Sequence, residues 1–223
     1  MITKHAQLIK RLPRWLYRLG AQSYIDRKYP RHLFIETTAL CNLSCNYCPR
    51  ERINQHMDFN LFRGIIDEAT KYGPRSFSLH LFGEPLLYPR INDAINYIKK
   101  RNRKHTVLLT TNGTKLNELF DSVRGADQIL WSWRKEAKFT EETKEKLKKW
   151  GKFRVRFIKE VTTPEAYEEW KTWENKEVRS LHNYGGEIDL ENFQSTPEEK
   201  LTRWPCYHLW LAPAVSWDGK KIL

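Results

Sequence analysis

Three cysteines with the spacing C-x3-C-x2-C are the residues of this chain best suited to chemistry. They are Cys41, Cys45 and Cys48 in the stretch CNLSCNYC, and no fourth cysteine lies nearby. Three thiolates on one loop can bind three irons of a cubic iron–sulfur cluster, whereas an electron-transfer ferredoxin supplies a fourth cysteine. The remaining iron can then bind a substrate or a cofactor, so the spacing favours cluster chemistry over electron storage.

The same thiolates can instead bind zinc. Structural zinc takes four ligands, usually from paired Cys-x2–4-Cys or His knuckles, and only Cys45 and Cys48 form such a pair. The alternative hypothesis is therefore a non-catalytic metal-binding module, holding zinc or an iron–sulfur cluster, that contacts RNA or protein. Spacing alone favours the cluster.

Residues 36–48, ETTALCNLSCNYC, resemble the cluster loop of radical S-adenosylmethionine (SAM) enzymes. The resemblance implies a [4Fe–4S] cluster on Cys41, Cys45 and Cys48, with SAM bound to the open iron. In this family the reduced cluster cleaves SAM, and the resulting 5′-deoxyadenosyl radical usually abstracts a substrate hydrogen. The resemblance also implies that Tyr47, just before the third cysteine, lies near the adenine.

A second motif follows about 40 residues after the cysteines, behind a predicted strand. The stretch LFGEP at 81–85 resembles the family's Gly-Gly-Glu-Pro motif, with Phe82 at the first glycine position. The resemblance implies that Glu84 holds the amino group of SAM. A carboxylate accepts hydrogen bonds from an amine, Gly83 allows a close backbone approach, and Pro85 fixes the turn.

Two weaker motifs follow the next two predicted strands. Asn112 lies in a Thr-Asn-Gly turn similar to one in the family, and the resemblance makes it a candidate cofactor contact, although Asn-Gly is also a general turn former. Ser132 stands where relatives carry Ser-x-Asp, and its serine is expected to contact SAM. Arg134 replaces the aspartate and is a candidate to pair with the SAM carboxylate.

Strand and helix patterns alternate along the chain after residue 30, which indicates parallel strands with helices outside. Strands are predicted at 32–38, 76–82, 106–111, 128–133, 153–159 and 187–190. Helices are predicted at 58–72, 89–102, 115–121, 140–150 and 164–175. The predicted fold class is α/β, a partial (β/α)6 TIM-like barrel that is open on one side.

Alternation within the strands also predicts which side chains face the barrel interior. The interior-facing polar residues are expected to be Glu36, Thr38, Ser78, His80, Arg154 and Arg156. The apolar residues expected to pack against the helices are Leu79, Leu81, Val155 and Phe157.

Three regions are predicted: a basic helical arm at 1–30, the partial barrel at 31–195, and a tail at 196–223. The tail resembles the start of a SPASM-like extension, which in relatives holds auxiliary clusters through further cysteines. Cys206 lacks such cysteines, so we expect a lone thiol and a tail that is truncated or naturally reduced.

The net charge of +12 indicates either a nucleic-acid or acidic partner or an ordinary basic enzyme. No Arg-rich stripe accompanies the charge, so nucleic acid is not favoured. Four cysteines without a disulfide pattern suggest a reducing cytoplasm. The sequence lacks a signal peptide pattern and an apolar run long enough for a transmembrane segment.

Together these patterns predict a radical SAM enzyme that abstracts hydrogen from a peptide, protein or small-molecule substrate. A reductant such as flavodoxin or ferredoxin is expected to supply the electron. A further alternative is an inactive descendant that binds SAM without modifying anything.

Overall fold

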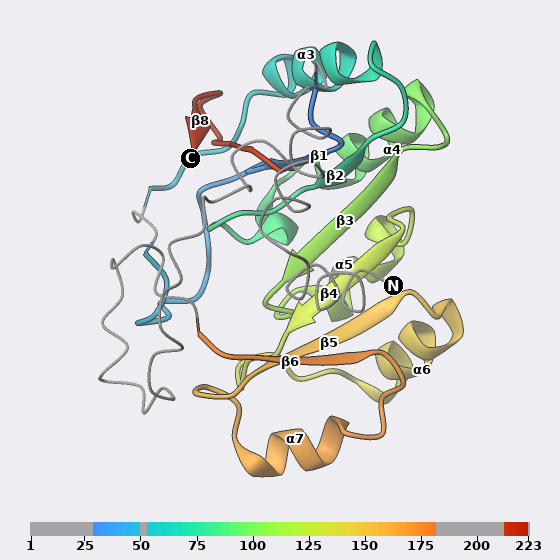
Figure 1. Cartoon of the computed structure of the whole chain (residues 1–223). Coiled ribbons are helices and arrows are strands. Elements are labelled where there is room, and N and C mark those ends of the chain that lie inside the picture. Colours follow the sequence, from blue (N-terminus) through green and yellow to red (C-terminus); the bar gives the residue numbers. More distant parts are fainter. Residues whose placement is uncertain (1–28, 50–52, 182–211, 223) are drawn as a thin grey trace, which may run out of the picture.

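One curved sheet organises the chain, for which the computed structural model describes residues 29–49, 53–181 and 212–222 (Figure 1). Its strand order is β6-β5-β4-β3-β2-β1-β7-β8, and every neighbouring pair is parallel except β7 and β8. The sheet does not close on itself, because β6 and β8 are separate edges. This confirms the predicted α/β architecture with parallel strands and an open side.

The parallel strands alternate with helices along the chain. The strands are β1 (His32–Ile35), β2 (Ser76–Ser78), β3 (Thr106–Thr111), β4 (Gln128–Ser132), β5 (Phe153–Ile158), β6 (Lys176–Arg179), β7 (Ala214–Val215) and β8 (Lys221–Ile222). The helices are α3 (Phe59–Thr70), the short 3-10 helix η1 (Pro85–Leu87), α4 (Ile91–Arg101), α5 (Leu116–Val123), α6 (Glu141–Trp150) and α7 (Pro164–Trp170).

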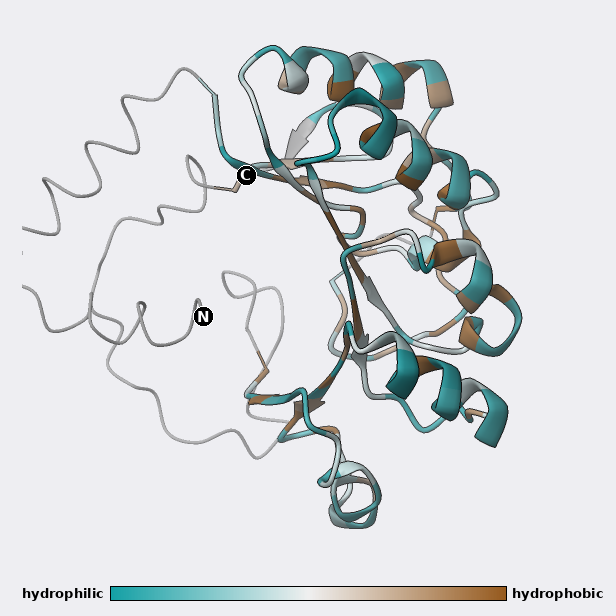
Figure 2. Ribbon diagram, turned by 90° about the vertical axis from the view of Figure 1, so that its right-hand side faces the viewer, coloured by the Kyte–Doolittle hydropathy of each residue, from teal (hydrophilic) through white to brown (hydrophobic). Residues whose placement is uncertain are grey.

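The main core lies between one face of the sheet and the helices. Figure 2 shows α3, α4, α5 and α6 on the same side of the sheet. Fully buried side chains from both layers fill this space, among them Ile35, Phe62, Ile66, Phe77, Ile95, Ile98, Leu109, Leu116, Ile129 and Leu147. The other face of the sheet is left to line the site described below.

Local sequence signals begin and end the helices where expected. Asp58 is the N-cap of α3, and its carboxylate accepts from the backbone N–H groups of Asn60 and Leu61. Thr140 caps α6 through Thr143 N. Gly151 ends α6 at φ 71°, a left-handed conformation that glycine adopts without strain.

Several predicted boundaries were wrong. β2 ends at Ser78 rather than at 82, and α7 ends at Trp170 rather than at 175. The structure also has a strand, β6, that was not predicted. Only Val178 in it is apolar, and that residue is exposed, so no buried pattern marks the strand. The predicted strand 187–190 lies outside the described residues, as do nearly all of the arm and Cys206.

The chain returns to the sheet near its end. β7 pairs in parallel with β1, and the hairpin from β7 to β8 turns through Gly219 at φ 85°. The N–H of Glu36 donates to Val215 O at 2.9 Å, which joins the tail to the strand before the cysteines. Residues 214–222 therefore extend the parallel sheet beyond β1.

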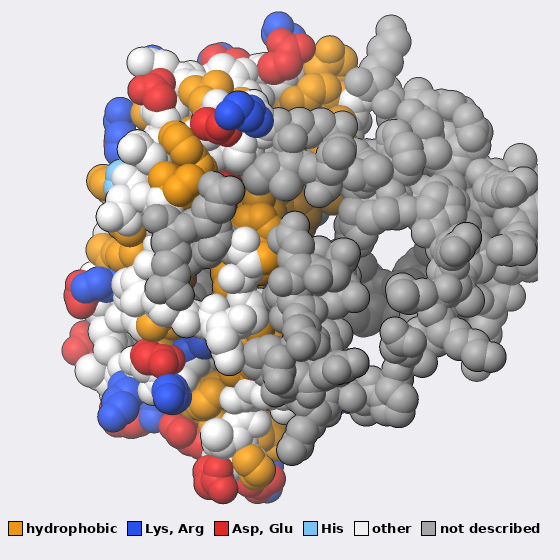
Figure 3. All heavy atoms as spheres, turned by 90° about the vertical axis from the view of Figure 1, so that its left-hand side faces the viewer, with side chains coloured by type: hydrophobic (Ala, Val, Ile, Leu, Met, Phe, Trp, Pro, Cys, Tyr) orange, Lys and Arg blue, Asp and Glu red, His pale blue; other side chains and the backbone are white. Residues whose placement is uncertain are grey.

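Within the described ranges, no helix combines the length and the apolar character that crossing a bilayer requires. On the face drawn in Figure 3, basic and acidic side chains are interspersed over the described part of the surface.

Candidate functional site

The three cysteines lie on the loop that follows β1. Cys41, Cys45 and Cys48 are half-buried and form no disulfide, and a turn closes between Cys48 N and Cys45 O at 3.2 Å. The backbone of this loop is anchored by Thr38, whose hydroxyl accepts from Leu40 N and donates to Gln55 O. All three thiols line one cavity.

This cavity, of about 580 Å³, lies where the parallel strands end at their carboxyl termini. Nine of the ten predicted site residues line it: Cys41, Cys45, Tyr47, Cys48, Gly83, Glu84, Asn112, Ser132 and Arg134. Pro85 does not line it; it is buried at the first position of η1. A second cavity of the same volume lies on the outer surface between α6 and α7, without Cys or His in its lining.

The loop after β2 packs directly against the cysteine loop, and Gly83 is the point of contact. A Cβ on Gly83 would lie 1.8 Å from Thr38 O and 3.1 Å from Leu40 O, which no real side chain tolerates. Glu84 N donates to Leu40 O at 2.8 Å. Glycine is therefore required here for the close approach of the two loops.

The carboxylate of Glu84 is buried and accepts three hydrogen bonds. Oε1 accepts from Leu86 N at 3.1 Å and from Thr111 Oγ1 at 2.6 Å, and Oε2 accepts from Asn112 N at 2.7 Å. Burial raises the pKa of Glu84 to about 7, although these donors and Arg134 favour the ionised form. Oε2 keeps a second lone pair for a further donor at the cavity.

Asn112 joins the end of β3 to the cysteine loop. Its side-chain amide donates to Asn42 Oδ1 at 2.9 Å and approaches Cys41 Sγ at 3.8 Å. Its backbone carbonyl accepts from Trp131 Nε1 at 3.0 Å. The next residue, Gly113, has φ 85°, and a Cβ there would meet Trp131 Nε1 at 2.5 Å. The turn therefore fixes the position of the loop around Cys41.

Tyr47, Ser132 and Arg134 come together at the wall formed by the end of β4. The Arg134 guanidinium lies 5.1 Å from the centre of the Tyr47 ring, within cation–π range. Its Nη1 donates to Ser132 Oγ at 3.2 Å and to Trp133 O at 2.5 Å. Burial raises the pKa of Tyr47, so its phenol remains neutral. The predicted SAM contacts of these residues stay predictions.

The donor set suits a thiolate-bound cluster. Three cysteines outside any disulfide border one cavity, and the side-chain N–H of Asn112 reaches the sulfur of Cys41 at 3.8 Å. In the part of the chain that the structure describes, no three Cys, His, Asp or Glu side chains are grouped closely enough to hold a single metal ion. Three thiolates at one cavity are the donors that a cluster takes, each binding a different iron.

The interior-facing prediction was correct for two of its polar residues, since His80 and Arg156 line the cavity. The other four residues make hydrogen bonds or ion pairs within the fold. Glu36 accepts from Phe82 N at 3.2 Å beneath the Gly-Glu loop, and Ser78 bonds His32. Thr38 anchors the cysteine loop, as described above, and Arg154 faces Glu177 at 3.8 Å.

Among the apolar residues, Leu79, Val155 and Phe157 belong to the core as predicted. The prediction that Leu81 packs against the helices was wrong, because Leu81 lines the cavity. β2 has already ended at Ser78, so strand alternation does not extend that far.

Sequence reasoning missed several cavity residues. Phe34 precedes the cysteines on β1, Arg179 ends the unpredicted β6, and 212–214 come from the tail. The charge of Arg179 was visible in the sequence, but only the pairing of β5 with β6 brings it to the cavity.

Comparison with known proteins was consistent with this geometry. Residues 35–132 match the family model described as the Radical SAM superfamily.

Three curated relatives are similar to this chain. The "Tungsten-containing aldehyde ferredoxin oxidoreductase cofactor-modifying protein" of Pyrococcus furiosus is 33% identical over 93 residues, or 40% of this chain and 25% of that protein. The "GTP 3',8-cyclase" of Chlorobaculum tepidum is 33% identical over 92 residues, or 40% and 28%. The "Probable GTP 3',8-cyclase" of Methanocaldococcus jannaschii is 36% identical over 100 residues, or 43% and 33%. The matched segment thus spans only a quarter to a third of these relatives.

Two solved structures share the fold. BtrN in complex with AdoMet and 2-DOIA has a TM-score of 0.62 at 17% identity, covering 87% of this chain and 73% of that chain. Streptococcus suis SuiB bound to precursor peptide SuiA has a TM-score of 0.65 at 14% identity, covering 92% and 61%.

Proposed function

We propose that this chain, in which residues 35–132 belong to the radical SAM superfamily, is a radical SAM enzyme with one [4Fe–4S] cluster and SAM as cofactor or cosubstrate. When bound, the reduced cluster and SAM supply a 5′-deoxyadenosyl radical that abstracts a hydrogen atom. The observation that carries the proposal is the meeting of Cys41, Cys45, Cys48 and Glu84 in one cavity at the strand ends.

The chain's own residues hold and orient these groups. The thiolates of Cys41, Cys45 and Cys48 would bind three irons. Glu84 would accept a hydrogen bond from the SAM amine through the second lone pair of Oε2, because its other acceptor positions are used by Leu86, Thr111 and Asn112. The backbone at Gly83 would lie against the cofactor, with Pro85 fixing the turn.

The wall of β4 would contact the rest of SAM. We assign the Tyr47 ring to the adenine and Ser132 to the ribose or carboxylate. Arg134, which already donates to Ser132 Oγ at 3.2 Å, would pair with the carboxylate. Asn112 would support the SAM site by holding the cysteine loop, since its side-chain amide donates to Asn42 Oδ1.

Substrate, reductant and location are part of the proposal. The similarity to GTP 3',8-cyclases supports a small-molecule substrate, and the fold shared with peptide-bound SuiB supports a peptide. We propose flavodoxin or ferredoxin as the electron donor and the cytoplasm as the compartment. The division into an arm at 1–30, a barrel at 31–195 and a SPASM-like tail at 196–223 is proposed on the same grounds.

Anaerobic reconstitution with iron and sulfide tests the proposal. We expect broad visible absorbance from a cluster, a change in its spectrum on adding SAM, and release of 5′-deoxyadenosine after reduction with dithionite. Substitution of Cys45 by Ala should abolish all three signals, whereas Cys206→Ala should leave them in place. Stoichiometric zinc with no response to SAM would instead support a metal-binding module. A loaded cluster that binds SAM but releases no 5′-deoxyadenosine would support an inactive descendant.

A further inference from the structure

The cavity has a second wall, formed by β5 and β6, which makes none of the proposed cluster or SAM contacts. Arg156 on β5 stands beside Ser132 of β4 and Glu177 of β6 in the sheet register. Arg179 pairs with Ile158 two residues further along the strands. Arg156 and Arg179 both line the cavity, opposite the cysteine loop along the sheet order.

This wall carries an excess of positive charge. Glu177 accepts from Arg156 Nε at 2.5 Å and lies 3.2 Å from Arg179 Nε and 3.8 Å from Arg154 Nη1. One carboxylate therefore faces three guanidinium groups. Among the described residues that line the cavity, Glu84 is the only acidic one, and it lies at the cofactor end.

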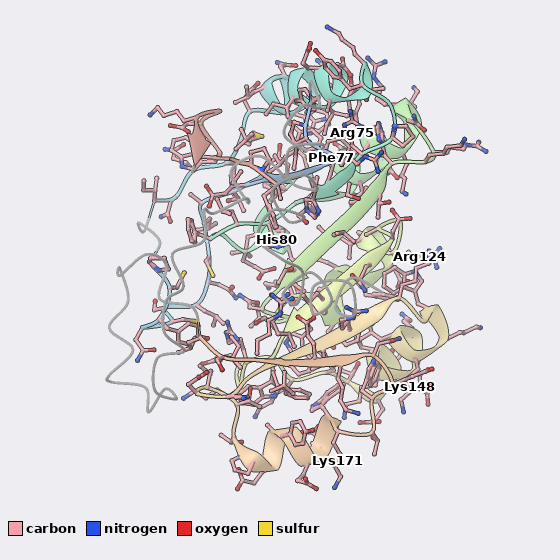
Figure 4. The ribbon with its side chains drawn as sticks, in the orientation of Figure 1. Arg75, Phe77, His80, Arg124, Lys148 and Lys171 are labelled. Atoms are coloured by element: carbon pink, nitrogen blue, oxygen red, sulfur yellow. The ribbon has the colours of Figure 1, made fainter. Side chains whose placement is uncertain are left out.

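His80, which follows β2 and lines the same cavity, adds a neutral donor. Its Nδ1 accepts from Thr110 N at 3.2 Å, which places the ring proton on Nε2. Burial, followed by the nearby charges of Arg156 and His32, lowers the pKa of His80 to about 3. The imidazole ring makes a T-shaped contact with the Phe34 ring, with 5.4 Å between the ring centres. Figure 4 shows His80 in the interior of the molecule, far from the outer edge that carries Arg124.

We infer that Arg156 and Arg179 of this wall, together with His80 in the lining of the same cavity, bind an anionic group of the substrate, a carboxylate or a phosphate. Guanidinium groups bind both groups through paired N–H donors, and a neutral imidazole N–H adds a further donor. SAM carries two positive charges and one negative charge, so a wall with this surplus does not match the cofactor as a whole. The inference rests on the proposed function only in taking this cavity as the substrate cavity.

Anion binding to the whole chain tests this inference. Pyrophosphate serves as the phosphate probe and glutarate as the carboxylate probe, each titrated calorimetrically into apo protein and into reconstituted protein with SAM. We expect binding of at least one probe at millimolar concentration or below, weakening with added salt. The probe that binds more tightly identifies the chemical class.

Three substitutions sharpen the test. Arg156→Gln should weaken probe binding at least tenfold. Arg156→Lys keeps the charge but loses the paired N–H donors of the guanidinium group, so it should weaken binding less. Glu177→Gln should strengthen binding several-fold, because it removes the carboxylate that competes for the arginines. Arg124→Gln, at an exposed helix end, is the matched control and should change nothing.

Two results would overturn the inference. One is the absence of probe binding to wild-type protein at ten millimolar in both preparations. The other is weaker SAM binding by Arg156→Gln with unchanged probe binding, which would assign Arg156 to the SAM carboxylate. Because the probes are also titrated into apo protein, a chain that fails to load a cluster would contradict the proposed function and leave this result standing.

Discussion

The two ends of the cavity are built differently. At the β1–β4 end, short buried contacts join the loops: the backbone of Gly83 lies against Thr38 O, and the Glu84 carboxylate accepts from Thr111 Oγ1 and Asn112 N. At the β5–β6 end, long charged side chains reach into the cavity, and Arg179 is 58% exposed. The first end depends on buried contacts with no room for change, and the second depends on charges that water screens.

This difference is consistent with the two roles proposed above, cofactor binding at one end and substrate binding at the other. A buried, bonded end suits a cofactor that must be held in one position, whereas a charged, half-solvated end suits a substrate that enters and leaves. It also predicts that substitutions at the first end reduce the free energy of unfolding, while those at the second end change binding and its salt dependence instead.

Gly83→Ala should have the largest effect. The new Cβ would lie 1.8 Å from Thr38 O, a backbone atom that cannot move without shifting the cysteine loop. We expect a loss of about 3 kcal/mol or more in the free energy of unfolding, measured by urea denaturation, together with poor cluster loading.

Gly64→Ala is the control for this change. Gly64 is an exposed position inside α3 with nothing within 4 Å of an added Cβ, so alanine should stabilise by about 0.5–1 kcal/mol. Equal effects at both positions would contradict the close approach of the two loops.

Glu84→Gln should cost about 1–3 kcal/mol, because an amide N–H2 cannot accept the bonds that both carboxylate oxygens accept. The cost should depend on pH. The pKa of Glu84 is raised to about 7 in the folded chain, so between about pH 4.5 and 7 the unfolded state loses the proton that the folded state keeps.

Wild-type stability from this group therefore falls as pH rises through that range, by roughly 3 kcal/mol at most. The advantage of wild type over Glu84→Gln should be largest near pH 4.5 and shrink towards pH 8, as measured by urea denaturation at a series of pH values. An advantage that grows with pH would mean that the hydrogen bonds lower the pKa below its ordinary value.

Trp131→Phe should have an intermediate effect. Trp131 Nε1 donates to the buried Asn112 carbonyl at 3.0 Å, and losing this donor should cost about 1–3 kcal/mol by thermal or urea unfolding. Trp150→Phe removes the same kind of bond, Nε1 to Arg124 O at 3.1 Å, at an exposed site. There water replaces the donor, so the cost should be well under that of Trp131→Phe.

Arg179→Gln should have the smallest effect on stability, within about 0.5 kcal/mol, because its ion pair with Glu177 is largely exposed on the arginine side. The same variant should still weaken the binding of pyrophosphate or glutarate. A large loss of stability here would show that the β5–β6 end is structural and would remove the contrast between the two ends.

Much of the β1–β4 end was predictable because its signals are local. The C-x3-C-x2-C spacing, the Gly-Glu-Pro stretch and the Asn-Gly turn each lie within a few residues, and strands of the right pattern precede them. Parallel strands align their carboxyl ends, so residues that follow successive strands had to converge. The convergence of Cys41, Glu84 and Asn112 followed from this rule.

The β5–β6 end was not predictable in the same way. β6 has no buried apolar pattern, so neither the strand nor the position of Arg179 could be derived from its own sequence. The position of Leu81 was wrong because the strand ended earlier than its hydrophobic run. Edge strands depend on pairing with a neighbour more than on their own residues.

The sequence by itself determined the alternation of strands and helices, the thiols that could bind iron, and the carboxylate placed after β2, because each depends on short spacing along the chain. Only the tertiary structure decided that Gly83 touches Thr38, that β7 returns to β1, and that Arg156 and Arg179 share one carboxylate. These contacts join residues that are distant in sequence or lie on neighbouring strands, and packing and pairing across the sheet alone bring them together.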